Sequence, residues 1–235
     1  DPGMHSSQNE QDSRMHARGS QVPMLEPSDS DECRAFTKLA FELSETYDTP
    51  VFVRTTTRVA HARSVVHPQE RVEAALKPYQ KDISKWVMMP GMAKGRHVVV
   101  EKRMNDLAKD ASSLPVNRVE MGDTKIGVIC SGMAYQYVKE VAPEISVLKL
   151  GIVNPLPMDL IADFARQVET LYVFEELEPV IEEQVAAHGI PVTGKALTGR
   201  QGELSAHKVA KLLGKEIPTA AQPDPVPARP PVLCP

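Results

Sequence analysis

The 235-residue chain is long enough for one large domain or two small ones. Its residues are 42% hydrophobic and 25% charged, which is the composition of an ordinary globular protein. A net charge of −4 and the lack of a basic cluster argue against nucleic-acid binding, and no apolar run approaches the roughly 18 residues of a membrane-spanning helix. We therefore expect a cytoplasmic protein with neither a nucleic-acid nor a membrane partner.

The first fourteen residues, DPGMHSSQNEQDSR, have no apolar periodicity and are predicted to form neither a core helix nor a strand. Nearly every side chain in this opening loop (residues 1–14) can form hydrogen bonds, and His5 is of the type best suited to proton transfer. Such a loop is either solvated or lines a site for a polar ligand. Composition alone favours the solvated alternative.

A strand–helix–strand unit is predicted next. It comprises a strand at residues 22–26, a helix at 29–47 with a capping-box-like start, and a buried strand in the β-branched run 51–57. Short connections between these elements predict a parallel βαβ unit. Two strands are too few for an independently stable sheet, so we expect this unit to be poorly packed or completed by another copy of the chain.

Residues 59–115 lack this alternation and are predicted to form a connector with one long helix at 92–112. Methionines in and near it, Met88, Met89 and Met92, are expected to pack rather than to bind a cofactor. Further on, Gly122 and Asp123 are expected to form a hairpin-like turn.

From residue 117 onward, strands and helices alternate. Strands are predicted at residues 125–130, 147–150 and 171–174, each followed by an amphipathic helix, with a fourth helix near Leu204 and Leu213. This spacing is typical of a doubly wound parallel sheet with helices on both faces. Seven prolines between Pro218 and Pro235 then predict an extended linker.

Two arginines, Arg54 and Arg58, flank a threonine run at the expected carboxyl end of a parallel strand, where open α/β sheets bind ligands. Arginine can bind a carboxylate with two hydrogen bonds, although a structural ion pair is at least as common. Ser131 and Gly132 lie between a strand and a helix, a corner that favours anions but also occurs for packing alone.

Acidic residues and cysteines give weaker signals. The acidic run around Glu175, Glu176 and Glu182 is expected to form a solvated or interface surface near a helix start. Three cysteines are too few and too widely spaced for an iron–sulfur or zinc site. Of these, Cys33 and Cys130 are expected to be packed and unreactive, and Cys234 lies in the proline-rich end.

Eight short strings scattered along the chain resemble those of one enzyme family. They are DPGMHSSQNEQDSR (1–14), PMLEPSDS (23–30), TPVFVRTTTR (49–58), SGMAYQYV (131–138), LKLG (148–151), NPLP (154–157), FEELEP (174–179) and GEL (202–204). On these strings the chain resembles the large subunit of indolepyruvate:ferredoxin oxidoreductases, within the 2-oxoacid:ferredoxin oxidoreductases. The resemblance implies an internal piece of a longer subunit.

The same resemblance implies the fold and its divisions. It is an α/β fold in which residues 1–67 form the C-terminal part of a thiamine pyrimidine-binding domain. Residues 68–116 are the connector, residues 117–215 form a transketolase C-terminal-like doubly wound parallel sheet, and residues 216–235 are the linker.

It also implies the activity of the parent enzyme, which is oxidative decarboxylation of an aryl 2-oxo acid such as indolepyruvate to its coenzyme A thioester. The implied cofactors are thiamine diphosphate with Mg²⁺ and [4Fe–4S] clusters. The implied partners are the remainder of the large subunit, a small subunit, ferredoxin, coenzyme A and the 2-oxo acid. A homodimer remains an open alternative.

The resemblance also implies that the matching residues of the opening loop face substrate or cofactor; they are His5, Ser6, Ser7, Gln8, Asn9 and Glu10. The alternative is that this loop only shapes a subunit interface. The glutamate that activates the thiamine ring and the Gly-Asp-Gly…Asn segment that binds the diphosphate through a metal do not occur in this sequence. The chain alone is therefore expected to be inactive and to bind no cofactor.

Two other functions stay open at this point. The chain could be a non-catalytic, flavodoxin-like assembly module that shares ancestry with the family. It could also belong to the same enzyme class with a different 2-oxo acid as substrate.

Overall fold

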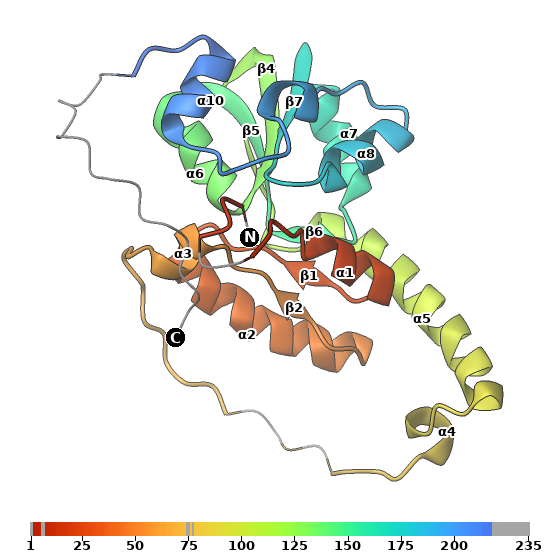
Figure 1. Ribbon diagram of the computed structural model, residues 1–235. Helices are drawn as coiled ribbons and strands as arrows, with labels where there is room; N and C mark the ends of the chain where they lie inside the picture. The colour runs from red at the N-terminus through yellow and green to blue at the C-terminus, as the bar shows by residue number, and fades with distance from the viewer. Residues whose placement is uncertain (1, 6–7, 74–75, 77, 218–235) are drawn as a thin grey trace.

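The computed structural model describes residues 2–5, 8–73, 76 and 78–217. It has an α/β fold in which a small three-stranded sheet and a larger four-stranded sheet are stacked end to end, with helices on their faces (Figure 1). The first described residues lie between the two sheets. No helix of the described part is long and apolar enough to cross a membrane.

The small sheet has the strand order β2-β1-β6. Strand β1 (Met24–Leu25) lies in the centre, β2 (Phe52–Val53) pairs with it in parallel and β6 (Ile152–Asn154) pairs with it antiparallel. The predicted βαβ unit is therefore present. It gains a third strand from the second half of the chain, which the sequence had not indicated.

The helix of this unit, α2 (Ser30–Tyr47), begins where the Asp29 carboxylate accepts a hydrogen bond from the amide of Glu32. It covers the face of the small sheet on which Leu25 lies, burying Phe36 and Leu43 there. The prediction that residues 51–57 form a buried strand is wrong. Strand β2 spans two residues at the edge of the sheet, and Phe52 is 44% exposed because no described strand pairs with its outer side.

The large sheet has the order β3-β5-β4-β7. Strands β4 (Asp123–Ser131), β5 (Ile145–Leu150) and β7 (Thr170–Phe174) are parallel, which confirms the predicted parallel arrangement. An additional strand, β3 (Arg118–Glu120), pairs antiparallel with β5 at one edge.

The expected hairpin at Gly122 and Asp123 is wrong, because β5 lies between β3 and β4. Gly122 instead allows close passage of the chain, since a Cβ atom there would be 2.1 Å from the carbonyl oxygen of Glu144. Only glycine fits at such a distance.

Helices cover both faces of the large sheet (Figure 1). Helices α6 (Gly132–Val141) and α10 (Ala206–Leu213) bury Val138 and Val209 against one face. Helices α7 (Met158–Ala165) and α8 (Val180–Ala187) bury Phe164, Ile181 and Val185 against the other. A short helix, α9 (Lys195–Thr198), precedes α10.

One hydrophobic core joins the two sheets. Met24 of β1 and Ala17 of α1 (Arg14–Ser20) pack in the same cluster as Leu150 of β5 and Phe164 of α7. Helix α1 was not predicted, because its seven residues contain only two buried side chains and no helical repeat. Burial of this shared apolar surface fixes the opening loop relative to both sheets.

The connector contains α3 (Thr57–His61), α4 (Ile83–Trp86), the predicted long helix α5 (Pro90–Asp110) and a 3-10 turn, η1 (Ala111–Ser113). The end of α5 packs into the core beside α2 through Leu107. Its beginning extends away from both sheets.

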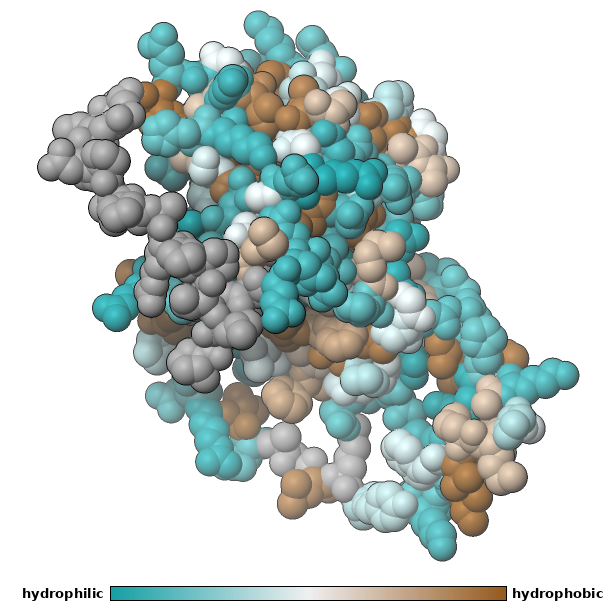
Figure 2. Space-filling view, viewed as in Figure 1, coloured by the Kyte–Doolittle hydropathy of each residue, from teal (hydrophilic) through white to brown (hydrophobic). Residues whose placement is uncertain are grey.

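The expected packing of Met88 and Met89 is not seen, since their exposed fractions are 53% and 61%. Together with Trp86 they form an apolar corner between α4 and α5, which lies in the lower right of Figure 2. The proposed domain boundaries remain predictions, and most of the predicted linker (residues 218–235) lies outside the described residues.

Candidate functional site

The carboxyl ends of the parallel strands of both sheets face each other around the opening loop. Glu26 follows β1, Arg54 follows β2, Ser131 ends β4 and Glu175 follows β7. Side chains at these four positions form hydrogen bonds with one another or with the loop. Carboxyl ends of parallel strands are where α/β folds place their sites.

The base of the loop is fixed by a buried ion-pair network centred on Arg14, which is 2% exposed. Its guanidinium donates to the Asp12 carboxylate at 2.6 Å and to the Glu175 carboxylate at 2.7 Å. It also donates to the carbonyl oxygens of Glu176 and Glu178, at 2.8 and 3.0 Å. Arg14, which belongs to the first half of the chain with the small sheet (the small-sheet unit), thus binds the carboxyl end of β7 in the large sheet (the large-sheet unit).

Burial and pairing act in opposite directions on these acids. Burial alone would raise the pKa of Asp12, but its hydrogen bonds and charge interaction with Arg14 outweigh burial and lower that pKa. Burial raises the pKa of Glu175, whose carboxylate also accepts the amides of Ile181 and Glu182 at the start of α8. The acidic run therefore does cap a helix start, but its solvated alternative is wrong for Glu175, which is 2% exposed.

Arg54 is 7% exposed and its guanidinium is bonded within the protein. It donates to the Glu26 carboxylate and to the Ser13 hydroxyl, the latter at 3.1 Å. Glu26 also accepts the hydroxyl of Ser131 at 3.0 Å. This pairing corresponds to the structural alternative considered for Arg54.

The anion-favouring corner at Ser131 and Gly132 is occupied by the same glutamate. Gly132 has a φ of 52°, and a Cβ atom there would be 2.9 Å from Oε1 of Glu26. The carboxylate of Glu26 thus supplies the negative charge that the start of α6 favours. The corner is thus already occupied by a carboxylate of this chain.

The first part of the loop, which includes His5 and Glu10, is bound by the segment that leads into α10. His5 Nε2 lies 2.9 Å from Oε1 of Glu203, and Arg58 donates to both oxygens of Glu203 at 2.7 Å. Glu10 Oε1 accepts the amides of Gly3 and Gly202, at 2.5 and 2.9 Å. The structure thus brings His5, Glu10 and Arg58 together, although they are far apart in sequence from Glu203.

Other predicted loop residues point outward or lie outside the described part. Gln8 and Asn9 are exposed, and Ser6 and Ser7 are not among the described residues.

A pocket of about 320 Å³ lies beside the loop, lined by Gln11, Ser13, His16, Arg54, Thr55 and Thr56. The Thr56 hydroxyl is buried there and has no hydrogen-bond partner within the described residues. Hydroxyl, imidazole and guanidinium groups together suit a carboxylate or another small polar group.

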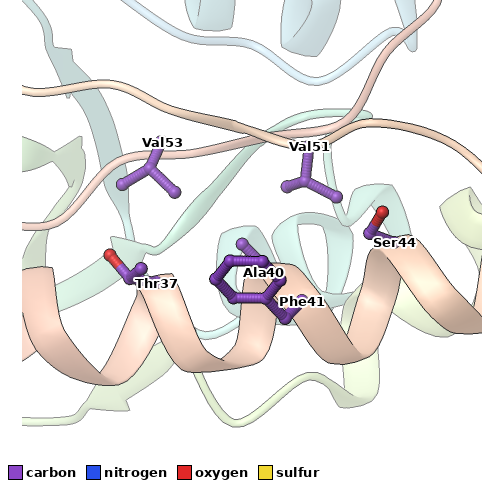
Figure 3. Close-up of a pocket in the computed structure, with 6 residues that line it drawn as sticks. All are labelled: Thr37, Ala40, Phe41, Ser44, Val51 and Val53. Atoms are coloured by element: carbon purple, nitrogen blue, oxygen red, sulfur yellow. The ribbon is translucent and has the colours of Figure 1, made fainter. Parts of the chain in front are cut away.

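A second pocket of about 340 Å³ is apolar and lies away from the loop, between α2 and the outer edge of β2 (Figure 3). Its lining residues are Thr37, Ala40, Phe41, Ser44, Val51 and Val53. Phe41 and Phe52 are exposed beside it. None of the predicted site residues lies in this groove.

The described residues contain no group of three or more His, Cys, Asp or Glu side chains that could hold a metal ion. Cys130 is fully buried and burial raises the pKa of its thiol to about 12, which agrees with its expected packing role. Cys33 is partly buried on α2, and Cys234 lies outside the described residues.

Sequence reasoning did not assign roles to Asp12, Glu26 or Glu203. Asp12 belongs to the opening string and Glu203 to the GEL string, so both were noted only as parts of a resemblance. Glu26 pairs with Arg54, 28 positions away, and Glu203 pairs with His5, 198 positions away. Asp12 binds Arg14 only two positions away, but it also accepts the amide of Glu178, 166 positions away. A local pattern could not have revealed them.

Comparison with known proteins gives whole-chain matches. The chain is 38% identical to indolepyruvate oxidoreductase subunit IorA of Thermococcus kodakarensis and 37% identical to the same subunit of Methanothermobacter thermautotrophicus. In both cases all of this chain is covered, but only 41% of the relative. No family model matches the sequence.

Among solved structures, the fold is similar to that of 2-oxoglutarate:ferredoxin oxidoreductase from Magnetococcus marinus, solved with 2-oxoglutarate, coenzyme A and succinyl-CoA bound. The TM-score is 0.51 at 12% identity, over 82% of this chain and 42% of that one, so the likeness concerns the fold alone. The predicted resemblance is confirmed, and the chain matches over its whole length about two fifths of the indolepyruvate oxidoreductase subunit IorA.

Proposed function

We propose that this chain is part of the large subunit of an indolepyruvate:ferredoxin oxidoreductase, which converts an aryl 2-oxo acid to its coenzyme A thioester and passes electrons to ferredoxin. The relationship to indolepyruvate oxidoreductase subunits supports this assignment. The remainder of the large subunit, a small subunit, coenzyme A and ferredoxin are the proposed partners. Its place of action is proposed to be the cytoplasm.

Within that enzyme, the opening loop faces the 2-oxo acid. The observation that carries this proposal is the position of the loop, which a dense set of internal bonds holds at the carboxyl ends of the parallel strands of both sheets. Gln8 and Asn9 remain exposed on it, and His5 retains its second ring nitrogen for a ligand. Fixed polar groups of this kind orient a substrate without having to be ordered when it binds.

The two arginines have different roles. Arg54 is committed to Glu26 and Ser13 and acts mainly to shape the pocket beside the loop. The side chain of Arg58 is 54% exposed while it binds Glu203, so one face of its guanidinium can still attract a carboxylate.

The chain by itself does not fit thiamine diphosphate. No described cluster could bind the metal of the diphosphate, and Glu26 fills the corner where an anion would meet the start of α6. We therefore assign cofactor binding to other parts of the subunit. Iron–sulfur clusters are likewise assigned to the remainder, since the two described cysteines are partly or fully buried and unpaired with each other.

Replacement of His5 by alanine in the complete two-subunit enzyme tests this function. We expect kcat/KM for indolepyruvate to fall about 10- to 100-fold, which is the range for losing one charge-assisted hydrogen bond at a site. The matched control is His97→Ala, which removes an exposed histidine on α5, far from the loop, where its partner is Glu101. Unchanged kcat/KM in His5→Ala would contradict a ligand-facing loop.

A non-catalytic assembly module is the second candidate. It is favoured by the fact that Arg14, Arg54 and Arg58 all bind carboxylates of this chain. In that case the loop would only join the two sheets, and His5→Ala would lower stability without changing turnover.

A further inference from the structure

The segment Gly202 to Leu204, which leads into α10, holds the opening loop from the side of the large sheet. Its position is fixed at three consecutive residues. The amide of Gly202 donates to Glu10, the side chain of Glu203 binds His5 and Arg58, and the amide of Leu204 donates to Glu176 at 2.7 Å.

Glu203 is the centre of this contact. Its side chain is 18% exposed, compared with 54% for Arg58 and 26% for His5. Burial works against its charge, but the hydrogen bonds from Arg58 and His5 outweigh burial and lower the pKa of Glu203. The carboxylate is therefore ionised at neutral pH and can only accept hydrogen bonds.

An acceptor at 2.9 Å determines which nitrogen of His5 carries a proton. Because Glu203 can only accept, Nε2 of His5 must donate to it. In neutral His5, the lone pair then lies on Nδ1, the ring nitrogen that does not contact Glu203. The carboxylate thus fixes both the orientation and the tautomer of the imidazole.

The backbone at this point supports a positional role. Met4 has a φ of 59° and His5 has a φ of 35°, values that L-residues adopt only at a cost. Two consecutive residues in this region persist only where surrounding contacts hold them. The hydrogen bonds that His5 donates to Glu203 and Gly3 donates to Glu10 are contacts of that kind.

We propose that Glu203 is a positioning residue of the site: it orients His5 and Arg58 of the small-sheet unit from the large-sheet unit, so that Nδ1 of His5 faces the 2-oxo acid. The proposal rests on the ligand-facing role of the loop. It makes the geometry of the site depend on the docking of the two units, since one carboxylate joins them.

A double-mutant cycle in the complete two-subunit enzyme tests the proposal, with indolepyruvate as substrate and a viologen dye as electron acceptor. Glu203→Gln keeps the shape of the side chain but removes its charge, and we expect kcat/KM to fall about tenfold. In a His5→Asn background the same change should cost clearly less than tenfold, because one of the two groups that Glu203 orients is then already gone. Glu203→Asp, which keeps the carboxylate, should recover part of the loss.

The matched control is Asp163→Asn, which removes a carboxylate paired with an arginine, Arg166, on α7 of the same unit. It should leave kcat/KM unchanged. Losses from Glu203→Gln and His5→Asn that multiply independently, or a Glu203→Gln enzyme with normal kcat/KM, would overturn the proposal. If the proposed ligand-facing role of the loop is itself wrong, His5→Asn alone would leave kcat/KM unchanged, and this outcome separates the two proposals.

Discussion

At the scale of single residues, Arg14 is the side chain on which the arrangement of the loop depends most. It is buried and binds two carboxylates and two carbonyl oxygens that belong to separate parts of the chain. Removing one member of a buried ion-pair network leaves the other charges without a partner, which costs more than the pair itself contributes.

Arg14→Leu should therefore lower the free energy of unfolding of the 235-residue chain by about 3 to 5 kcal/mol. Arg200→Leu is the control, because Arg200 pairs with Glu178 at the surface and its loss should cost less than about 1 kcal/mol. Urea unfolding monitored by circular dichroism measures both. Equal, small losses would mean that the network contributes little.

The residues of the candidate site were only partly predictable. The opening string showed that His5 and Glu10 belong together in a polar loop, and the β-branched run showed that Arg54 follows a strand. Arg58 was expected at the same strand end, but it lies on α3. The carboxylate that joins His5 and Arg58 lies 145 positions beyond Arg58. Such a pairing depends on how two sheets dock, which no local pattern in one sequence contains.

At the scale of elements, long apolar strands were predictable and short edge strands were not. β4, β5 and β7 are buried and rich in β-branched residues, so their pattern is clear. Strand β3 has only three residues, two of them charged. Strand β6 follows β5 after a single glycine, Gly151. The glycine predicts a turn, whereas the chain continues directly into the other sheet.

The open edge of β2 is the element that most clearly needs a partner. Phe52 and Arg54 donate their amides to Pro23 and Leu25, so Val51 and Val53, which alternate with them, present their backbone groups to the open side. Beside that edge lies the apolar groove of Figure 3. Because the chain spans 41% of its relatives, we expect the remainder of the large subunit to cover this edge.

Hydrogen exchange of the protein, followed in a proteolytic fragment that covers residues 50–56, tests that expectation. The amide of Val53 should exchange rapidly in the isolated chain and at least about 100-fold more slowly in the full-length subunit, since an amide paired in a sheet interior exchanges only when the sheet opens. Protection that grows with the concentration of the isolated chain would instead identify another copy as the partner. Equal protection in the dilute chain and the full subunit would contradict both.

At the scale of the whole molecule, the chain contains a fixed polar loop and the sheets that support it, but none of the groups expected to anchor thiamine diphosphate. Neither the Gly-Asp-Gly…Asn segment nor a described metal-binding cluster is present. The doubly charged diphosphate depends on a divalent metal for most of its binding. The two-sheet arrangement was predictable from alternating elements, whereas the shared core of Met24 and Leu150 that docks the sheets was not.

We infer that this chain forms part of the substrate site but does not anchor the cofactor. Calorimetry tests this inference: thiamine diphosphate with Mg²⁺ is titrated into the 235-residue chain and, separately, into the full-length subunit. We expect no binding to the isolated chain at concentrations up to about 1 mM, and micromolar binding to the full-length subunit (a difference of at least about 4 kcal/mol). Micromolar binding to the isolated chain would contradict the assignment of the anchor to other segments.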